Sequence, residues 1–176
     1  DIKVKHQIGL KFPKHETERN NELLKSFTNG QVARMKLYPG DEDFSFVSQY
    51  KEKYYITIAP ISLWFTKQYP VELWIKMIKD ISGHFNVYLL GSEKDKTQIE
   101  TMIGAANNDN VYNLAGKLNL LQTAALIKDA HMNFSNDSAP LHFASAMNAP
   151  VTAVFCSTVP EFGFGPLSDD SIVIET

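Results

Sequence analysis

Residues 54–90 read YYITIAPISLWFTKQYPVELWIKMIKDISGHFNVYLL, and this stretch decides the fold class. It opens on a continuous apolar run over 54–59, which is typical of a strand buried on both faces. Apolar residues then recur at helical spacing over 70–82, with Pro70 suited to the first turn. A second apolar run covers 84–90. This order predicts two parallel strands joined by a helical crossover.

The same alternation continues to the last residue of the sequence. We expect helices over 93–106, 119–130 and 138–147, and strands over 110–114, 131–135, 151–155 and 171–175. Asn119 is the expected N-cap of the second of these helices. The sequence therefore predicts an α/β domain over 46–176, with a Rossmann-like parallel sheet and helices on both faces.

Residues 1–45 have a different character. The pattern predicts a strand or extended piece over 2–12 and one helix within 15–30, whose short apolar face is Leu23, Leu24 and Phe27. Asn29 and Gly30 are typical helix stop signals, and a polar connection follows over 36–43. We interpret 1–45 as an arm and interdomain linker that precedes the α/β domain.

Composition excludes several classes of protein. The chain has 176 residues and a net charge of -3, and nothing in this charge balance indicates a nucleic-acid partner. Its apolar stretches are far shorter than the ~20 residues of a membrane-spanning helix. The single cysteine, Cys156, permits no intrachain disulfide, and the chain does not begin with Met. We expect a piece of a longer cytoplasmic protein, with at most peripheral association with the inner membrane.

The loop after the first predicted strand carries groups that suit a phosphate. Ser62, Thr66 and Lys67 supply two hydroxyls and a positive charge between a strand end and a helix start. The GxxxxGK[ST] pattern of a Walker A loop is absent. The alternative is that the hydroxyls cap turns and Lys67 is a solvated surface charge.

The segment 135–142, SNDSAPLH, joins a strand to a helix start. Helix N-termini carry unpaired N–H groups and partial positive charge, so this one suits a diphosphate. Asp137 is placed to accept hydrogen bonds from sugar hydroxyls, and Ser138 and His142 share one face of the first turn. The alternative is an ordinary capped helix.

Weaker signals follow the next strands. Glu93, after Gly91, resembles the acid of a ribose-recognition loop, and the small residues of 113–117 let backbone approach a flat base. GxGxxG and GxSxG are both absent, and the histidines show no metal-ligand spacing. Each of these loops has the alternative of being a common turn.

Five loops resemble one family when taken in order. SLWFTKQYP (62–70), LLGSEKD (89–95), NLAGKLNL (113–120), SNDSAPLHFASAMNAP (135–150) and FGFGP (162–166) resemble the C-terminal domain of the family 9 glycosyltransferases, the ADP-heptose:lipopolysaccharide heptosyltransferases. The resemblance covers 54–166, and HETERNNELLKSF (15–27) looks like the stretch that enters this domain. It implies the C-terminal half of a GT-B fold, the half that holds the nucleotide-sugar donor.

The resemblance also implies a role for each loop. Those near the diphosphate and the sugar would be Ser62, Thr66, Lys67, Asp137, Ser138 and Ala139, with His142 supporting the turn. Lys67 would stabilise the leaving diphosphate, Glu93 would lie near the ribose, and the base would lie along Leu114, Ala115, Gly116 and Leu118. No metal and no cofactor is implied. The general base and the lipopolysaccharide core acceptor belong to the family's N-terminal domain, so we expect no transferase activity from this chain alone.

The sequence departs from the family pattern at Ala139, where Gly is usual, and a phosphate contact there requires a negative φ. Two alternatives stay open beside the heptosyltransferase reading. One is another GT-B enzyme, a transferase or an epimerase, that uses a UDP-sugar. The other is a non-catalytic α/β module whose polar loops are only caps.

Overall fold

The computed structural model describes residues 14–31, 33–81, 83 and 85–176. Its centre is a parallel sheet in the order β3-β2-β1-β4-β5-β6. The strands are β1 Tyr55–Ala59, β2 Asn86–Leu89, β3 Val111–Asn113, β4 Met132–Asn136, β5 Val151–Phe155 and β6 Ser171–Glu175. The predicted Rossmann-like α/β fold is confirmed.

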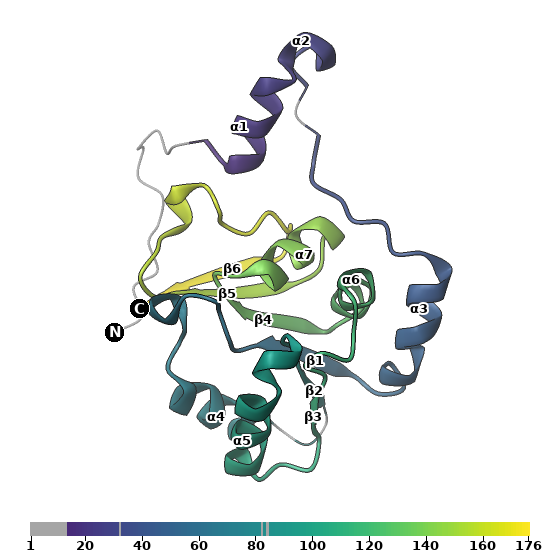
Figure 1. The fold of residues 1–176 in the computed structure, drawn as a ribbon, viewed down its shortest axis with the longest axis vertical. Coiled ribbons are helices and arrows are strands. Elements are labelled where there is room, and N and C mark those ends of the chain that lie inside the picture. Colours follow the sequence, from purple (N-terminus) through teal and green to yellow (C-terminus); the bar gives the residue numbers. More distant parts are fainter. Residues whose placement is uncertain (1–13, 32, 82, 84) are drawn as a thin grey trace.

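Helices cover both faces of this sheet (Figure 1). Buried residues of α4 and α5 pack on one face, and those of α3, α6 and α7 pack on the other. Asn119 caps α6 as predicted, because its Oδ1 accepts from the Gln122 N–H at 2.8 Å. The helices are α3 Asp41–Val47, α4 Val71–Asp80, α5 Lys96–Ala106, α6 Leu120–Lys128 and α7 Ala139–Met147. Short 3-10 turns are η1 Ser48–Tyr50, η2 Phe65–Lys67, η3 Glu93–Asp95 and η4 Pro160–Phe162.

Strand β1 shows why its sequence is apolar at every position except Thr57. Tyr55 packs into the core on the α6 and α7 side, whereas Ile56 and Ile58 pack into the core on the α4 and α5 side. Each such apolar side chain contributes roughly 1.5–3 kcal/mol when fully buried. The Tyr55 hydroxyl satisfies its polar end by donating to the Leu126 carbonyl at 2.7 Å. A strand between two helical layers therefore has no solvent face to make polar.

The arm differs from its prediction in two places. The single helix expected within 15–30 is broken at Leu24 into α1 Glu16–Leu23 and α2 Lys25–Thr28. The expected polar connection over 36–43 includes the start of α3, which is stabilised because the Asp43 carboxylate accepts from the Gly40 N–H at 2.9 Å. The predicted boundary at residue 45 therefore falls inside a helix, and the division of the chain there stays a prediction. The piece expected over 2–12 lies outside the described residues.

The start of α1 is attached to the segment after β5. The Glu16 N–H donates to the Gly163 carbonyl at 2.9 Å, and His15 Nε2 lies 3.1 Å from the Gly165 carbonyl oxygen. Beyond this attachment, α1 and α2 extend away from the sheet (Figure 1). None of the helices in the described part of the chain combines the length and the apolar character needed to cross a membrane.

Candidate functional site

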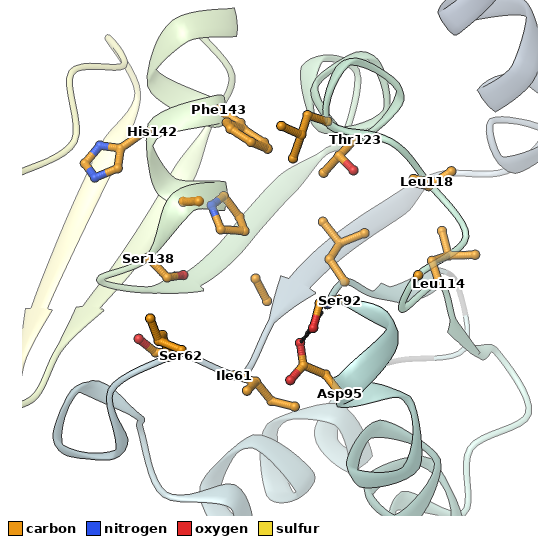
Figure 2. A pocket seen from close by; sticks show the side chains of 18 of the residues that line it. Ile61, Ser62, Ser92, Asp95, Leu114, Leu118, Thr123, Ser138, His142 and Phe143 are labelled. Carbon is orange, nitrogen blue, oxygen red and sulfur yellow. Dashed lines mark hydrogen bonds between the residues drawn. The ribbon is translucent and has the colours of Figure 1, made fainter.

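The candidate site is a cleft of about 900 Å³ beyond the carboxyl ends of the strands. The loops that follow β1, β2, β3 and β4 line it, together with Phe164 from the segment after β5. Figure 2 shows Ser62, Ser138 and His142 at one end of this cleft and Leu114 and Leu118 at the other. The cleft therefore occupies the place that parallel α/β sheets offer to ligands.

Most residues selected from the sequence come together in this cleft. Those that line it are Ser62, Lys67, Glu93, Leu114, Gly116, Leu118, Asp137, Ser138, Ala139 and His142. Two do not. Thr66 is exposed on the η2 turn outside the cleft lining, and Ala115 is buried in the core on the α4 and α5 side. The binding role of every one of these residues stays a prediction.

Lys67 and Asp137 form the charged centre of the site. Lys67 Nζ lies 2.5 Å from Asp137 Oδ2, and the Thr158 hydroxyl donates to the same oxygen at 2.8 Å. The Asp137 side chain is only 6% exposed, against 26% for Lys67. The two meet because β1 and β4 are neighbours in the sheet, so the loops that follow them leave it side by side. Neither this pairing nor the contact with Thr158 was apparent from the sequence.

Asn136 fixes the position of the loop that carries Lys67. Its fully buried side chain donates to the Pro60 carbonyl at 2.7 Å and accepts from the Tyr69 N–H at 2.9 Å. Gln68 adds a bond within the loop, because its side-chain amide donates to the Ser62 carbonyl at 2.7 Å. Both ends of the loop are thus tied to the end of β4, and the sequence signal was only a polar residue at a strand end.

The N-terminus of α7 opens on the cleft without a side-chain cap. Ser138 occupies the N-cap position, yet its hydroxyl contacts the Ser135 hydroxyl at 3.1 Å and the Asn136 carbonyl at 3.3 Å instead of the first-turn amides. Ala139 is not among the residues with positive φ, so the condition set for a phosphate contact there is met. The alternative interpretation of this loop was an ordinary capped helix, and the Ser138 side chain makes no capping hydrogen bond to α7.

His142 lies one turn into α7, behind this N-terminus. Burial lowers its pKa below the usual value, and this outweighs the negative charge of Asp137, which acts to raise it. The imidazole packs edge-on against Phe164, with ring centroids 6.3 Å apart. His142 is therefore a neutral, packed side chain near neutral pH, which fits the supporting role expected for it.

The other end of the cleft is formed by two loops in backbone contact. The Gly116 N–H donates to the Gly91 carbonyl at 3.0 Å, and Gly116 has a φ of 73°. The Glu93 side chain is 72% exposed at the rim. In the loop that follows β2, the Asp95 carboxylate accepts hydrogen bonds from both the N–H and the hydroxyl of Ser92 at 2.7 Å (Figure 2). The absence of a side chain at Gly116 thus lets the neighbouring loop approach, and contact of this segment with a flat base stays a prediction.

The sequence reading missed much of the cleft's lining. It includes Ile61, Leu63, Trp64, Leu90, Ser92, Asp95, Asn119, Leu120, Thr123, Pro140, Phe143 and Phe164. Leu120 and Thr123 are three residues apart on α6, so helical spacing was an available signal for that wall. Across the residues described, no three His, Cys, Asp or Glu side chains gather as a metal site.

The sequence model of glycosyltransferase family 9 (heptosyltransferase) matches residues 2–176. The chain belongs to this family. Lipooligosaccharide heptosyltransferase 2 of Haemophilus ducreyi is 37% identical to it over 99 residues, which are 53% of this chain and 28% of that protein. Lipopolysaccharide heptosyltransferase 2 of Escherichia coli K12 is 32% identical over 112 residues, which are 61% of this chain and 32% of that protein.

Solved structures of family members share the fold. The E. coli ADP-heptose lipopolysaccharide heptosyltransferase II has a TM-score of 0.73 and 27% identity over 82% of this chain and 46% of its own. A family 9 glycosyltransferase from Veillonella parvula has a TM-score of 0.82 and 18% identity over 98% of this chain and 52% of its own. The E. coli heptosyltransferase WaaC with ADP has a TM-score of 0.72 and 19% identity, covering 98% and 53%. This family 9 chain spans about half the length of these structures.

Proposed function

We propose that this chain is the donor-binding half of a glycosyltransferase that transfers heptose from ADP-heptose to the lipopolysaccharide inner core. The observation that carries the proposal is the Lys67–Asp137 pair beside the uncapped start of α7 in one cleft. A lysine and a helix N-terminus that face the same space suit an anion with two phosphates. Membership of the heptosyltransferase family supports the reaction class.

The chemistry of the proposed step is stabilisation of a leaving nucleoside diphosphate. As the glycosidic bond breaks, negative charge grows on the diphosphate, and preorganised donors lower the barrier most where charge develops. Lys67 would move its ammonium from Asp137 to the phosphate. The amides at Ser138 and Ala139 would donate to the same group. Asp137 would then be available to the hydroxyls of the donor sugar.

The nucleoside would occupy the other end of the cleft. Leu114, Leu118 and Phe143 offer apolar walls for a base, and the Glu93 carboxylate lies at the rim where ribose hydroxyls would reach it. The choice of adenine rests on relatives. One similar structure is described as containing ADP and another as containing ADP-2-deoxy-2-fluoro heptose.

The acceptor and its activation belong to a longer protein in this proposal. The chain spans about half the length of the solved relatives, and we place the lipopolysaccharide core site and the general base in the part it does not cover. We therefore expect donor binding, and no heptose transfer, from the 176 residues alone. Peripheral association with the inner membrane would follow from a lipid-anchored acceptor.

Calorimetric titration of the chain with ADP, UDP, GDP and adenosine tests the proposal. ADP should bind in preference to UDP and GDP. Lys67→Ala should lower the affinity for ADP by about tenfold or more, as expected for a lost charge-assisted bond, and should leave the affinity for adenosine unchanged. Lys76→Ala is the matched control, because Lys76 is exposed on α4 and lies outside the lining of the cleft.

Two other outcomes would point elsewhere. A preference for UDP would favour another GT-B enzyme, a transferase or an epimerase that uses a UDP-sugar. No nucleotide binding by the folded chain would contradict a donor-binding half and favour a non-catalytic module.

A further inference from the structure

Thr158 belongs to the segment that follows β5, and it reaches the site because β5 is the neighbour of β4. The two strands are paired up to Asn136 and Val154, and the Asp137 N–H still donates to the Val154 carbonyl at 3.1 Å. The segments that follow the two strands therefore leave the sheet side by side. This brings the Thr158 hydroxyl to 2.8 Å from Asp137 Oδ2.

The two oxygens of the Asp137 carboxylate have unequal surroundings. Oδ2 accepts from both Lys67 and Thr158, whereas Oδ1 accepts no hydrogen bond from any residue that the structure describes. An ionised carboxylate can accept about four hydrogen bonds, so Asp137 keeps unused capacity. Because its side chain lines the cleft, Oδ1 is the oxygen left for a hydroxyl of a bound ligand.

The two partners of Oδ2 respond differently to a diphosphate. Lys67 is a flexible cation that the phosphate attracts, so its bond to Asp137 is exchanged when the donor enters. Thr158 is neutral and β-branched, with a stiff χ1, so its bond to Asp137 persists. The terminal torsion of an aspartate is broad, and without that bond the carboxylate would rotate toward the departing ammonium.

We infer that Thr158 is a positioning residue, which holds the Asp137 carboxylate in the orientation that the donor sugar requires. This inference rests on the proposed function, because it concerns the sugar that the same cleft would hold. Thr158 acts through Asp137 and does not line the cleft itself. Its hydroxyl should therefore affect the extra affinity that the sugar adds to ADP, and not the affinity for ADP alone.

The test is calorimetric titration of the chain with ADP and with ADP-heptose. In the unmodified protein, ADP-heptose should bind more tightly than ADP. Thr158→Val keeps the shape and removes the hydroxyl, and it should reduce that preference by about tenfold while changing ADP affinity by less than about twofold. Thr158→Ser should restore the preference. Thr101→Val makes the same change on α5, outside the lining of the cleft, and should change neither affinity.

Several results would overturn the inference. If Thr158→Val keeps the full preference for ADP-heptose over ADP, the hydroxyl does not position Asp137. The same follows if Thr158→Ser loses this preference as much as Thr158→Val does. Equal loss of both ligands would indicate a structural role. If Thr158→Val does not fold, Thr158→Ala replaces it. If the unmodified chain binds ADP and ADP-heptose with equal affinity, this inference alone is overturned. If it binds no nucleotide, the proposed function is overturned as well.

Discussion

The amide nitrogen of Gly116 lies 3.0 Å from the carbonyl oxygen of Gly91, and this contact joins the loops that follow β3 and β2. A Cβ on Gly116 would lie 2.9 Å from the Cα of Glu93 and still closer to its carboxylate. The backbone of Gly116 also has a φ of 73°, in the left-handed region. The shape of this end of the cleft therefore depends on the absence of one side chain.

Gly116→Ala should lower the free energy of unfolding by about 1–3 kcal/mol, because it combines a left-handed φ with a clash against the Glu93 backbone. It should also lower the affinity for ADP, since the loop that carries Glu93 must move to admit the methyl group. Urea unfolding and calorimetry measure the two effects. Gly104→Ala is the control: Gly104 lies in α5 with nothing within 4 Å of its position for a Cβ, and this change should stabilise the helix by about 0.5–1 kcal/mol. A Gly116→Ala variant of unaltered stability would contradict the argument.

Asn136→Ala should be among the more destabilising changes at the site. It leaves the Pro60 carbonyl and the Tyr69 N–H without their buried partner, and we expect a loss of about 2–4 kcal/mol in the free energy of unfolding. Asn136→Asp keeps the shape and the acceptor for Tyr69 but loses the donor to Pro60, so it should also destabilise. Denaturant unfolding of both variants, beside the exposed Asn20→Ala on α1, checks this. Equal stability of all three proteins would show that Asn136 does not tie β4 to the Lys67 loop.

His142 should make the folded state sensitive to acid. Burial lowers its pKa in the folded chain, so below about pH 6.5 the unfolded chain binds the proton more readily, and stability is lost as the pH falls toward the folded-state pKa. His142→Gln removes this contribution. The difference in the free energy of unfolding between about pH 7.5 and pH 5 should therefore be smaller in the variant than in the unmodified protein. A difference of the same size in both proteins would show that His142 titrates alike in the folded and unfolded chains.

Secondary structure within the α/β domain could be predicted because it depends on neighbours in the sequence. The runs over 151–155 and 171–175 coincide with β5 and β6. β5 is buried at all five positions, as expected of a strand between two helical layers. β6 is an edge strand whose first three residues are exposed, and its signal was the β-favouring run of Ile172, Val173 and Ile174. The arm was harder. The break at Leu24 and the start of α3 at Asp41 follow signals only one or two residues long, and Val47 of α3 is buried by residues of α6 that lie far along the chain.

The candidate site was likewise predictable from the sequence only in part. The amino-acid sequence alone determined that polar groups follow successive parallel strands, and hence that Lys67 and Asp137 gather at one edge of the sheet. The tertiary structure decided what these groups do to one another. Lys67 meets Asp137 across 70 residues, and Thr158 meets it across 21, only because β1, β4 and β5 are neighbours in the sheet. The periodicity of a strand records which faces are buried. The order of strands in the sheet is set by packing between distant segments, which no local pattern records.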